Sequence, residues 1–518
     1  MRIELLAALL GFSGALAGCG GSQAPKGTEA PPLKGASVSI AAVGDGAILP
    51  VVTAQLGEWQ ASREAVCVVE SKPVEVSNLG GAQVLLFRGD RLGDLVDAGA
   101  LAVLPESLVQ PASTADSGED GKSVEVESSR APDQDDPEPL QFSDVIPAYR
   151  DQVSKYGSDR MALPLGGTAL VLVYNRAAFD GPGNLDAAKA AGLTLEPPAT
   201  WKELDALARF FEGRNWNGAA GKDHGIALPL GEDSEGVADA CLIARAAALG
   251  LHKDHYSLLF DSDTMEPRLT SPPFVEALQG LAGLKTSGPP GMESFDARAA
   301  REAFRKGNVA FLIDRAEQAG QWGGAMVKRV GVAPLPGSER VFEPVRAVWE
   351  PVKTPNRPSY LPAGGGWLVG VSATAAGRER EAAIDFVKYL INAETSNRLR
   401  ADRDLPMLPV RSSQLGQGLI DPRSTPGVES RDWSEAVNKT LVALRVLPGL
   451  RIPQADAYLA DLAKGRVEAV QGKPADAALK EAAQAWSGRT KALGTARQLW
   501  HYRRSLNSLV TLSKPPSR

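Results

Sequence analysis

The sequence predicts an α/β fold built on a mostly parallel sheet. Short apolar runs, which are typical of strands buried on both faces, alternate along the chain with amphipathic segments at helical spacing. The chain has 518 residues, which is enough for two or three domains. In open sheets of this kind ligands lie beyond the carboxyl ends of the strands, so residues that follow strands are the first binding-site candidates.

The N-terminal residues carry an export signal. Arg2 precedes an apolar run that is too short to span a membrane as a helix, and the sequence LAGC follows at residues 16–19. These four residues resemble the lipobox of bacterial lipoproteins, in which the cysteine becomes the lipid-modified N-terminus. We therefore expect a signal peptide over 1–18, lipid on Cys19, a tether over 19–35 and an extracytoplasmic, membrane-anchored protein. An ordinary cleaved signal with a chance cysteine is the alternative.

The formal net charge of -6 comes from one segment. Residues 113–139 hold nine acidic and two basic residues and almost no large apolar side chains, so we predict a disordered surface insertion. The rest of the chain is close to neutral, which excludes the basic surface of a nucleic-acid-binding protein. Beyond Cys19 the only cysteines are Cys67 and Cys241, and an exported chain permits either a disulfide or two free thiols.

The elements follow in order from local pattern. The strongest expectations are a strand over 36–42, a helix over 48–62, a strand over 84–87, a helix ending near 98, a strand over 169–174, a strand over 309–313 and a helix over 378–391. Thr200 and Glu203 form a capping box at the start of another helix. From residue 431 onward the pattern is helical, with breaks at 448–449 and 472–474.

Several short motifs occur in an order that resembles a known family. They are YN at 174–175, PATWKE at 198–203, AFRKG at 303–307, PLPG at 334–337 and GGGWLV at 364–369. Each is weak alone, but their collinearity behind the lipobox resembles extracellular solute-binding protein family 1, the sugar-binding subunits of ABC importers. The acidic insertion and a long C-terminal tail depart from that pattern.

The resemblance implies a two-lobed, type II periplasmic-binding-protein-like fold with hinge-joined lobes, a ligand cleft and extra C-terminal helices. One lobe would hold residues 36–168 and 336–398, and the other 169–335 and 399–510. The glycines at 364–366 would then lie where the chain crosses between the lobes beside the solute. A tight turn before a buried strand is the alternative explanation for them.

Candidate ligand-binding residues follow from these positions. Asp45, Arg88, Asp90 and Asp314 follow strands, and Gly166 and Thr168 belong to a second glycine-rich crossing. Sugars also need flat apolar faces and carboxylates, which suggests the remaining candidates. These are Trp322, Trp349, Glu350, Gly365, Gly366 and Trp367. For the tryptophans and acids, packing, ion-pairing or solvated positions are the competing interpretations.

Enzymatic function is disfavoured. The chain has four histidines, and His252-Lys-Asp-His255 lacks the metalloprotease spacing, so we interpret it as a surface loop or helix face. Phosphate-binding loops, nucleophile elbows and paired-cysteine metal motifs are not found, and we expect no cofactor and no metal.

The sequence therefore predicts a monomeric lipoprotein that captures a sugar or oligosaccharide and delivers it to an ABC permease. A binding lipoprotein of the same fold with a sensor or adhesion role, or one for a non-sugar solute, is the alternative.

Overall fold

The computed structural model describes residues 33–108, 140–324, 327, 329–417, 425–508 and 514–516. The expected export signal, most of the tether and the acidic insertion lie outside the described residues. Within the described ranges, every helix is either too short or too polar to cross a membrane.

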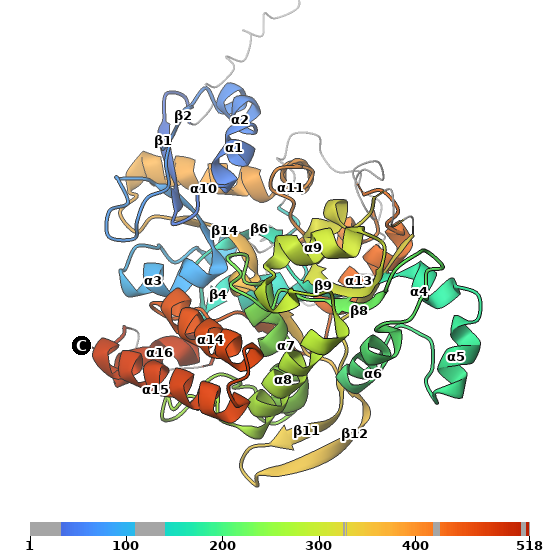
Figure 1. Ribbon diagram of the computed structural model, residues 1–518. Coiled ribbons are helices and arrows are strands. Elements are labelled where there is room, and N and C mark those ends of the chain that lie inside the picture. Colours follow the sequence, from blue (N-terminus) through green and yellow to red (C-terminus); the bar gives the residue numbers. More distant parts are fainter. Residues whose placement is uncertain are drawn as a thin grey trace, which may run out of the picture.

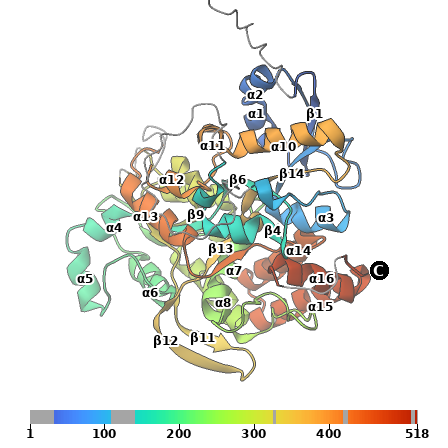
Figure 2. The same cartoon turned by 180° about the vertical axis from the view of Figure 1, so that it is seen from behind.

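A five-stranded sheet organises the first lobe, with strand order β2-β1-β3-β14-β6. Strand β1 runs parallel to β2 and β3, whereas β14 runs antiparallel to both β3 and β6. Figures 1 and 2 show this lobe at the top, with α10 lying across the sheet. The strands are β1 (Ser37–Val43), β2 (Val66–Val69), β3 (Val84–Arg88), β6 (Leu163–Gly167) and β14 (Gly366–Val371). The helices are α1 (Ile48–Thr53), α2 (Leu56–Arg63), α3 (Leu92–Asp97), α10 (Gly377–Ile391) and α11 (Ala393–Arg400).

A four-stranded sheet organises the second lobe, with strand order β10-β7-β9-β8. Strand β7 is antiparallel to β10 and β9, and β8 is parallel to β9. The strands are β7 (Leu170–Asn175), β8 (His224–Ala227), β9 (Val309–Arg315) and β10 (Val330–Pro334). The helices are α4 (Arg176–Asp180), α5 (Asn184–Ala190), α6 (Trp201–Phe211), α7 (Val237–Gly250), α8 (Pro272–Gly283) and α9 (Ala297–Arg305), with α13 (Ser430–Leu441) packed on β10.

Smaller elements complete the described chain. A hairpin of β11 (Ser338–Glu343) and β12 (Val348–Asn356) projects from the second lobe, at the bottom of Figure 1. Two strand pairs are β13 (Ser359–Leu361) with β15 (Val446–Pro448) and β4 (Lys155–Tyr156) with β5 (Asp159–Arg160). Several short elements also border the lobes. They are helix α12 (Ser412–Leu415), the π-helix η4 (Ala148–Val153) and the 3-10 turns η1 (Gly89–Arg91), η7 (Ala316–Gln321) and η8 (Ala363–Gly365).

The C-terminal helices connect the two lobes. These helices are α14 (Ala455–Val470), α15 (Ala475–Leu493) and α16 (Thr495–Ser505). Helices α14 and α15 pack on α8, while α16 packs on α3 and β4 of the first lobe. The buried His501 ring on α16 lies 2.8 Å from Asp97 Oδ1 and 3.0 Å from the Tyr156 hydroxyl. The tail is thus a structural part of both lobes.

The structure confirms the main elements and corrects several details. Both sheets are mixed rather than mostly parallel, because β14 and β7 each enter their sheet from a crossing segment. The expected helix over 48–62 is divided at 54–55 into α1 and α2. The Thr200–Glu203 capping box is present, with the Glu203 amide donating to Thr200 Oγ1 at 3.2 Å. Cys67 and Cys241 are free thiols, on β2 and α7 respectively.

The expected boundary at residue 336 does not coincide with the change of lobe. Hairpin strand β11 and strand β13 both pack on α7 of the second lobe, so the chain returns to the first sheet only at β14. The segment after residue 399 is also divided, since the backbone of Leu408 pairs with Gly167 of β6. The chain therefore passes between the two lobes more than twice.

Candidate ligand-binding site

A cavity of about 320 Å³ lies where the chain crosses between the lobes. Three crossing segments border it: 167–168 between β6 and β7, Ala363 before β14 with Gly366 at its start, and 403–407 after α11. The first lobe adds residues that follow its strands, and the second lobe adds the start of α7, helix α9 and turn η7. Its charged and aromatic lining comprises Asp45, Arg88, Glu235, Arg301, Arg315, Glu317, Trp367, Arg403 and Asp404.

Glu235 is the centre of an ion-pair network on the second-lobe wall. Its Oε2 accepts from Arg315 Nη2 at 2.6 Å and also pairs with Arg301 Nη2, and its Oε1 accepts from Arg301 Nη1 at 3.1 Å. Arg301 Nε in turn lies 3.0 Å from Asp314 Oδ2 behind it. Side chains bonded on several sides hold fixed positions, so this wall offers a pre-organised polar surface.

Glu317 contributes a carboxylate with one oxygen uncommitted. Its Oε1 accepts from Thr168 Oγ1 at 2.6 Å, whereas Oε2 is buried and has no hydrogen-bond partner among the described residues. The side chain is only 5% exposed, and burial raises the pKa of this carboxyl group despite the nearby Arg315 guanidinium. A buried oxygen without a partner is costly, which makes Glu317 a candidate acceptor for a ligand hydroxyl.

The first-lobe wall is more open. Arg88 Nη1 lies 3.8 Å from Asp45 Oδ2, and both side chains are about one-third exposed or more. A neighbouring cavity of about 300 Å³ shares Asp45, Arg88 and Arg315 and adds Asp90 and Tyr360. Burial raises the pKa of Asp90, with Arg88 opposing that shift. The cleft therefore continues past the central cavity toward α7.

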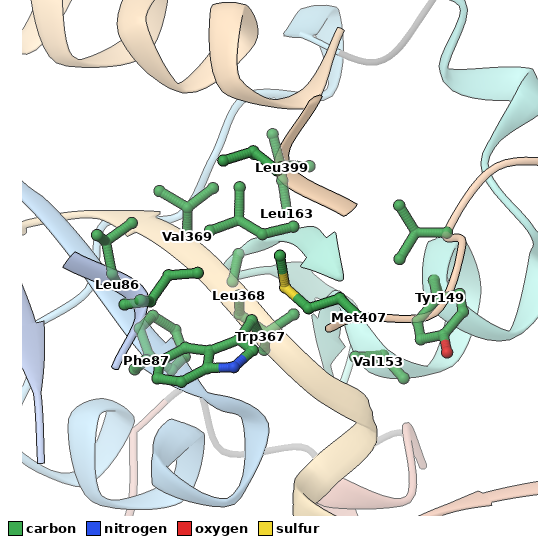
Figure 3. Packing of buried hydrophobic residues seen from close by; sticks show 14 of the residues in the cluster. Leu86, Phe87, Tyr149, Val153, Leu163, Trp367, Leu368, Val369, Leu399 and Met407 are labelled. Carbon is green, nitrogen blue, oxygen red and sulfur yellow. The ribbon is translucent and has the colours of Figure 1, made fainter. Parts of the chain in front are cut away.

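Trp367 is the aromatic residue of the central cavity. It is the second residue of β14, opposite Arg88 and Gly166, and the residue is 6% exposed. In Figure 3 the ring lies between Phe87 and the Met407 side chain. Trp367 is thus part of the first-lobe core and also lines the cavity.

The three glycines before Trp367 allow backbone to approach backbone. At Gly364 (φ +64°) an added Cβ would lie 2.2 Å from the Gly89 carbonyl carbon, and at Gly366 (φ +120°) 2.3 Å from the Gly166 oxygen. Gly366 also borders the cavity, whereas Gly365 packs on Val153. The tight crossing is therefore the main reason for the glycine run.

The structure brings some of the sequence candidates together. Asp45, Arg88, Thr168, Gly366 and Trp367 line the central cavity, and Asp90 lines its neighbour. Gly166 lies just behind the wall, where an added Cβ would meet Met407 Sδ at 2.3 Å.

Four other candidates lie elsewhere. Trp322 is fully buried and donates to Asp314 Oδ2 at 2.8 Å, and Asp314 is 1% exposed, so this pair supports Arg301 from behind. Trp349 and Glu350 lie on β12 of the projecting hairpin, where Arg340 stacks on the Trp349 ring and Glu350 pairs with His252 at 3.2 Å. None of the four lines the central cavity.

Sequence analysis missed most of the second-lobe wall. Glu235 and Glu317 lie in a loop and a turn that carry no recognised motif. Arg301 lies on α9, two residues before the AFRKG motif, and was not singled out. Arg315 had a usable signal, because side chains alternate along a strand and Asp314 and Arg315 therefore face opposite ways. Residues 403–407 form a crossing that appeared from sequence to belong to the tail.

The central cavity is electrically balanced. It is lined by four guanidinium groups, those of Arg88, Arg301, Arg315 and Arg403, and four carboxylates, those of Asp45, Glu235, Glu317 and Asp404. Paired charges supply both donors and acceptors without a net field, a combination that suits hydroxyl groups. Within the described residues, no cluster of three or more metal-ligating side chains was found.

Comparisons with known proteins agree with this geometry. The family model for the bacterial extracellular solute-binding protein matches residues 74–415. Comparison with curated protein sequences gave no match. Similar solved structures include an ABC transporter solute-binding protein from Agrobacterium radiobacter K84 in complex with ribitol, with 20% identity, TM-score 0.58, and coverage of 88% of this chain and 99% of that one.

Two further structures have the same fold. The cyclic alpha-maltosyl-1,6-maltose binding protein from Arthrobacter globiformis is 17% identical, with TM-score 0.57 and coverage of 88% of this chain and all of that one. A solute-binding protein from Agrobacterium vitis S4 with bound D-mannitol is 18% identical, with TM-score 0.55 and coverage of 88% and 99%.

The chain belongs to the bacterial extracellular solute-binding protein family and has its two-lobed type II fold. Members of this family are extracytoplasmic binding proteins rather than enzymes.

Proposed function

We propose that this protein is the substrate-binding component of an ABC importer for a sugar or polyol. The observation that carries the proposal is the balanced, pre-organised cavity between the lobes, with the free Glu317 oxygen in its wall. The family and the sugar- and polyol-bound structures of the same fold support the choice of solute.

The proposed mechanism is capture by lobe closure. Asp45, Arg88 and Trp367 belong to the first lobe, and Glu235, Arg315 and Glu317 to the second, so only the closed form brings both sets to one ligand. A ligand that binds the closed form more tightly shifts the population toward it. We propose that the closed protein, held at the membrane by lipid on Cys19, then delivers the solute to a permease.

A thermal-shift screen of the chain from residue 20 onward tests the proposal. The probes are ribitol, mannitol, common monosaccharides and maltodextrins, each at millimolar concentration. A ligand at a hundred times its Kd should stabilise the fold by about 2.7 kcal/mol. A melting temperature unchanged by every sugar and polyol would contradict the proposed solute class.

The variant Arg315→Gln tests whether the ligand binds in this cavity. Arg315 lies on the cavity wall and its loss leaves Glu235 paired with Arg301. We expect this variant to fold and to lose most of the ligand-dependent shift. An equal shift in the variant would place the ligand outside this cavity.

A further inference from the structure

Arg400 is a buried cation that has no carboxylate partner among the described residues. It ends α11 and is 7% exposed, and its one hydrogen bond to the described part of the chain joins Nη2 to Gln417 Oε1 at 3.3 Å. Its buried Nε has no hydrogen-bond partner, and no carboxylate among the described residues lies within ion-pair distance of it. Such a group is normally paired, because an isolated charge is costly to remove from water.

Other buried arginines of the same protein are well bonded. Arg466, 1% exposed, donates to Asp239 Oδ1 at 2.7 Å and to the carbonyl oxygens of Leu230 and Gly231 at 2.8 and 3.0 Å. Arg451, equally buried, donates to four backbone carbonyl groups. Arg400 makes fewer hydrogen bonds than either of them. Burial lowers the pKa of the Arg400 guanidinium group, as it also does for Arg451.

Arg400 lines a side cavity of about 300 Å³. The side cavity adjoins the central cavity, because Glu317, Gln318 and Met407 line both. Its wall also includes the apolar side chains of Ala316, Ala319 and Trp433. An ion pair formed against apolar walls is stronger than one in open water.

The other polar groups of the side cavity are largely committed. Gln321 Nε2 donates to Gln318 Oε1 at 2.6 Å, and Trp433 Nε1 donates to the Ala316 oxygen at 2.8 Å. Asp402 Oδ1 accepts the backbone amides of residues 404 and 405 at 2.9 and 3.0 Å. Arg403 is a second cation of this wall. Among the described groups of this wall, the Arg400 guanidinium is therefore the one that an anion would pair with.

We propose that the side cavity binds an anionic substituent of the ligand, a carboxylate or a phosphate, through the Arg400 guanidinium. The proposal rests on the proposed function, because the hydroxylated part of the same ligand occupies the central cavity and donates a hydroxyl to Glu317 Oε2. The substrate class is then an acidic sugar or a phosphorylated polyol. Guanidinium matches both anions with paired N–H donors.

The test measures affinity for matched neutral and acidic probes by calorimetry. Galactose is compared with galacturonate, glucose with glucuronate and with glucose 6-phosphate, and glycerol with glycerol 3-phosphate. We expect at least one acidic member to bind about 10- to 100-fold more tightly than its neutral partner. The carboxylate and phosphate pairs distinguish the two sources of charge.

Arg400→Gln is the decisive variant. It should abolish the preference for the acid and leave the affinity for a neutral sugar unchanged. The melting temperature of the unliganded variant should equal or exceed that of the wild type, because the variant lacks a buried cation that has no carboxylate partner among the described residues. Arg445→Gln is the control: Arg445 donates to Leu251 O and Asn356 Oδ1, both at 2.7 Å, outside the cavities. That variant should lose stability and keep the preference.

Several results would overturn the inference. Neutral probes that bind as tightly as their acids would reject the anion site while leaving the proposed function intact. An acid preference that survives Arg400→Gln would place the charge elsewhere. If Arg400→Gln does not fold, the salt dependence of the wild-type protein decides, because only acid binding should weaken as sodium chloride rises. Binding of no probe would overturn the proposed function as well.

Discussion

Replacing Glu317 by glutamine should separate ligand affinity from stability. The native carboxylate uses one oxygen for Thr168 Oγ1 at 2.6 Å and leaves the other buried without a partner among the described residues. Glutamine retains the Thr168 acceptor but loses the charge. A hydrogen bond from a ligand hydroxyl to a charged acceptor is worth about 1.5–3 kcal/mol, so we expect affinity to fall about 10- to 100-fold.

The same change should stabilise the unliganded protein. Burial raises the pKa of Glu317 above its ordinary value of 4.5, so the native group contributes stability when protonated and loses it as pH rises through the folded-state pKa. The variant should therefore be more stable than the wild type at pH 7, and the two stabilities should converge below pH 4.5. Arg315 keeps its bond to Glu235 at 2.6 Å in the variant.

Urea denaturation at several pH values and calorimetry with the ligand found by screening provide the measurements. Glu212→Gln is the control, since Glu212 pairs with His224 away from the cavity. Unchanged affinity together with lower stability at pH 7 would refute the reasoning, because Glu317 would then be a structural anion rather than a ligand acceptor.

Three further predictions concern the crossing, the tail and the anchor. Gly364→Ala should lower the free energy of unfolding by more than about 2 kcal/mol in urea titrations, because its Cβ would lie 2.2 Å from the backbone of Gly89; a stable variant would show that the crossing relaxes easily. Burial alone would raise the pKa of Asp97, but hydrogen bonds from His501 and an arginine lower it to about 2. The ionised carboxylate therefore stabilises the folded protein by about 2 kcal/mol above pH 3.8, and this stabilisation is lost as the pH falls toward 2. Asp97→Asn should remove that part of the pH dependence, and an identical acid unfolding curve would exclude it. Cys19→Ser should move the protein from the membrane fraction to the soluble fraction on centrifugation, and an unchanged distribution would count against lipid attachment.

Sequence patterns predicted the fold well because strands and capped helices are local. The buried run at 84–87 and the Thr200 capping box needed only neighbouring residues to be recognised. The strand directions could not be predicted without knowing where the chain re-enters each sheet. Strand β14, for example, enters the first-lobe sheet after the chain has passed through the second lobe. For the same reason the hairpin at 338–356 could not be assigned to its lobe from sequence.

The candidate site was only partly predictable. The crevice rule located Asp45 and Arg88 because both directly follow strands, but it also selected Asp314, whose side chain faces the core rather than the cavity. Trp322 was chosen for its ring, yet its place depends on a hydrogen bond to Asp314 that sequence does not reveal. Glu235 and Glu317 are distant in sequence from the first-lobe residues, and only the tertiary fold brings them to the same cavity.

The most direct test of the central claim is small-angle X-ray scattering of the chain from residue 20 onward with and without a stabilising sugar, polyol or sugar acid. The account predicts a smaller radius of gyration with ligand, and no such compaction for Arg315→Gln at the same concentration. A ligand that binds without changing the radius of gyration, or that compacts the variant equally, would contradict capture by lobe closure at this cavity.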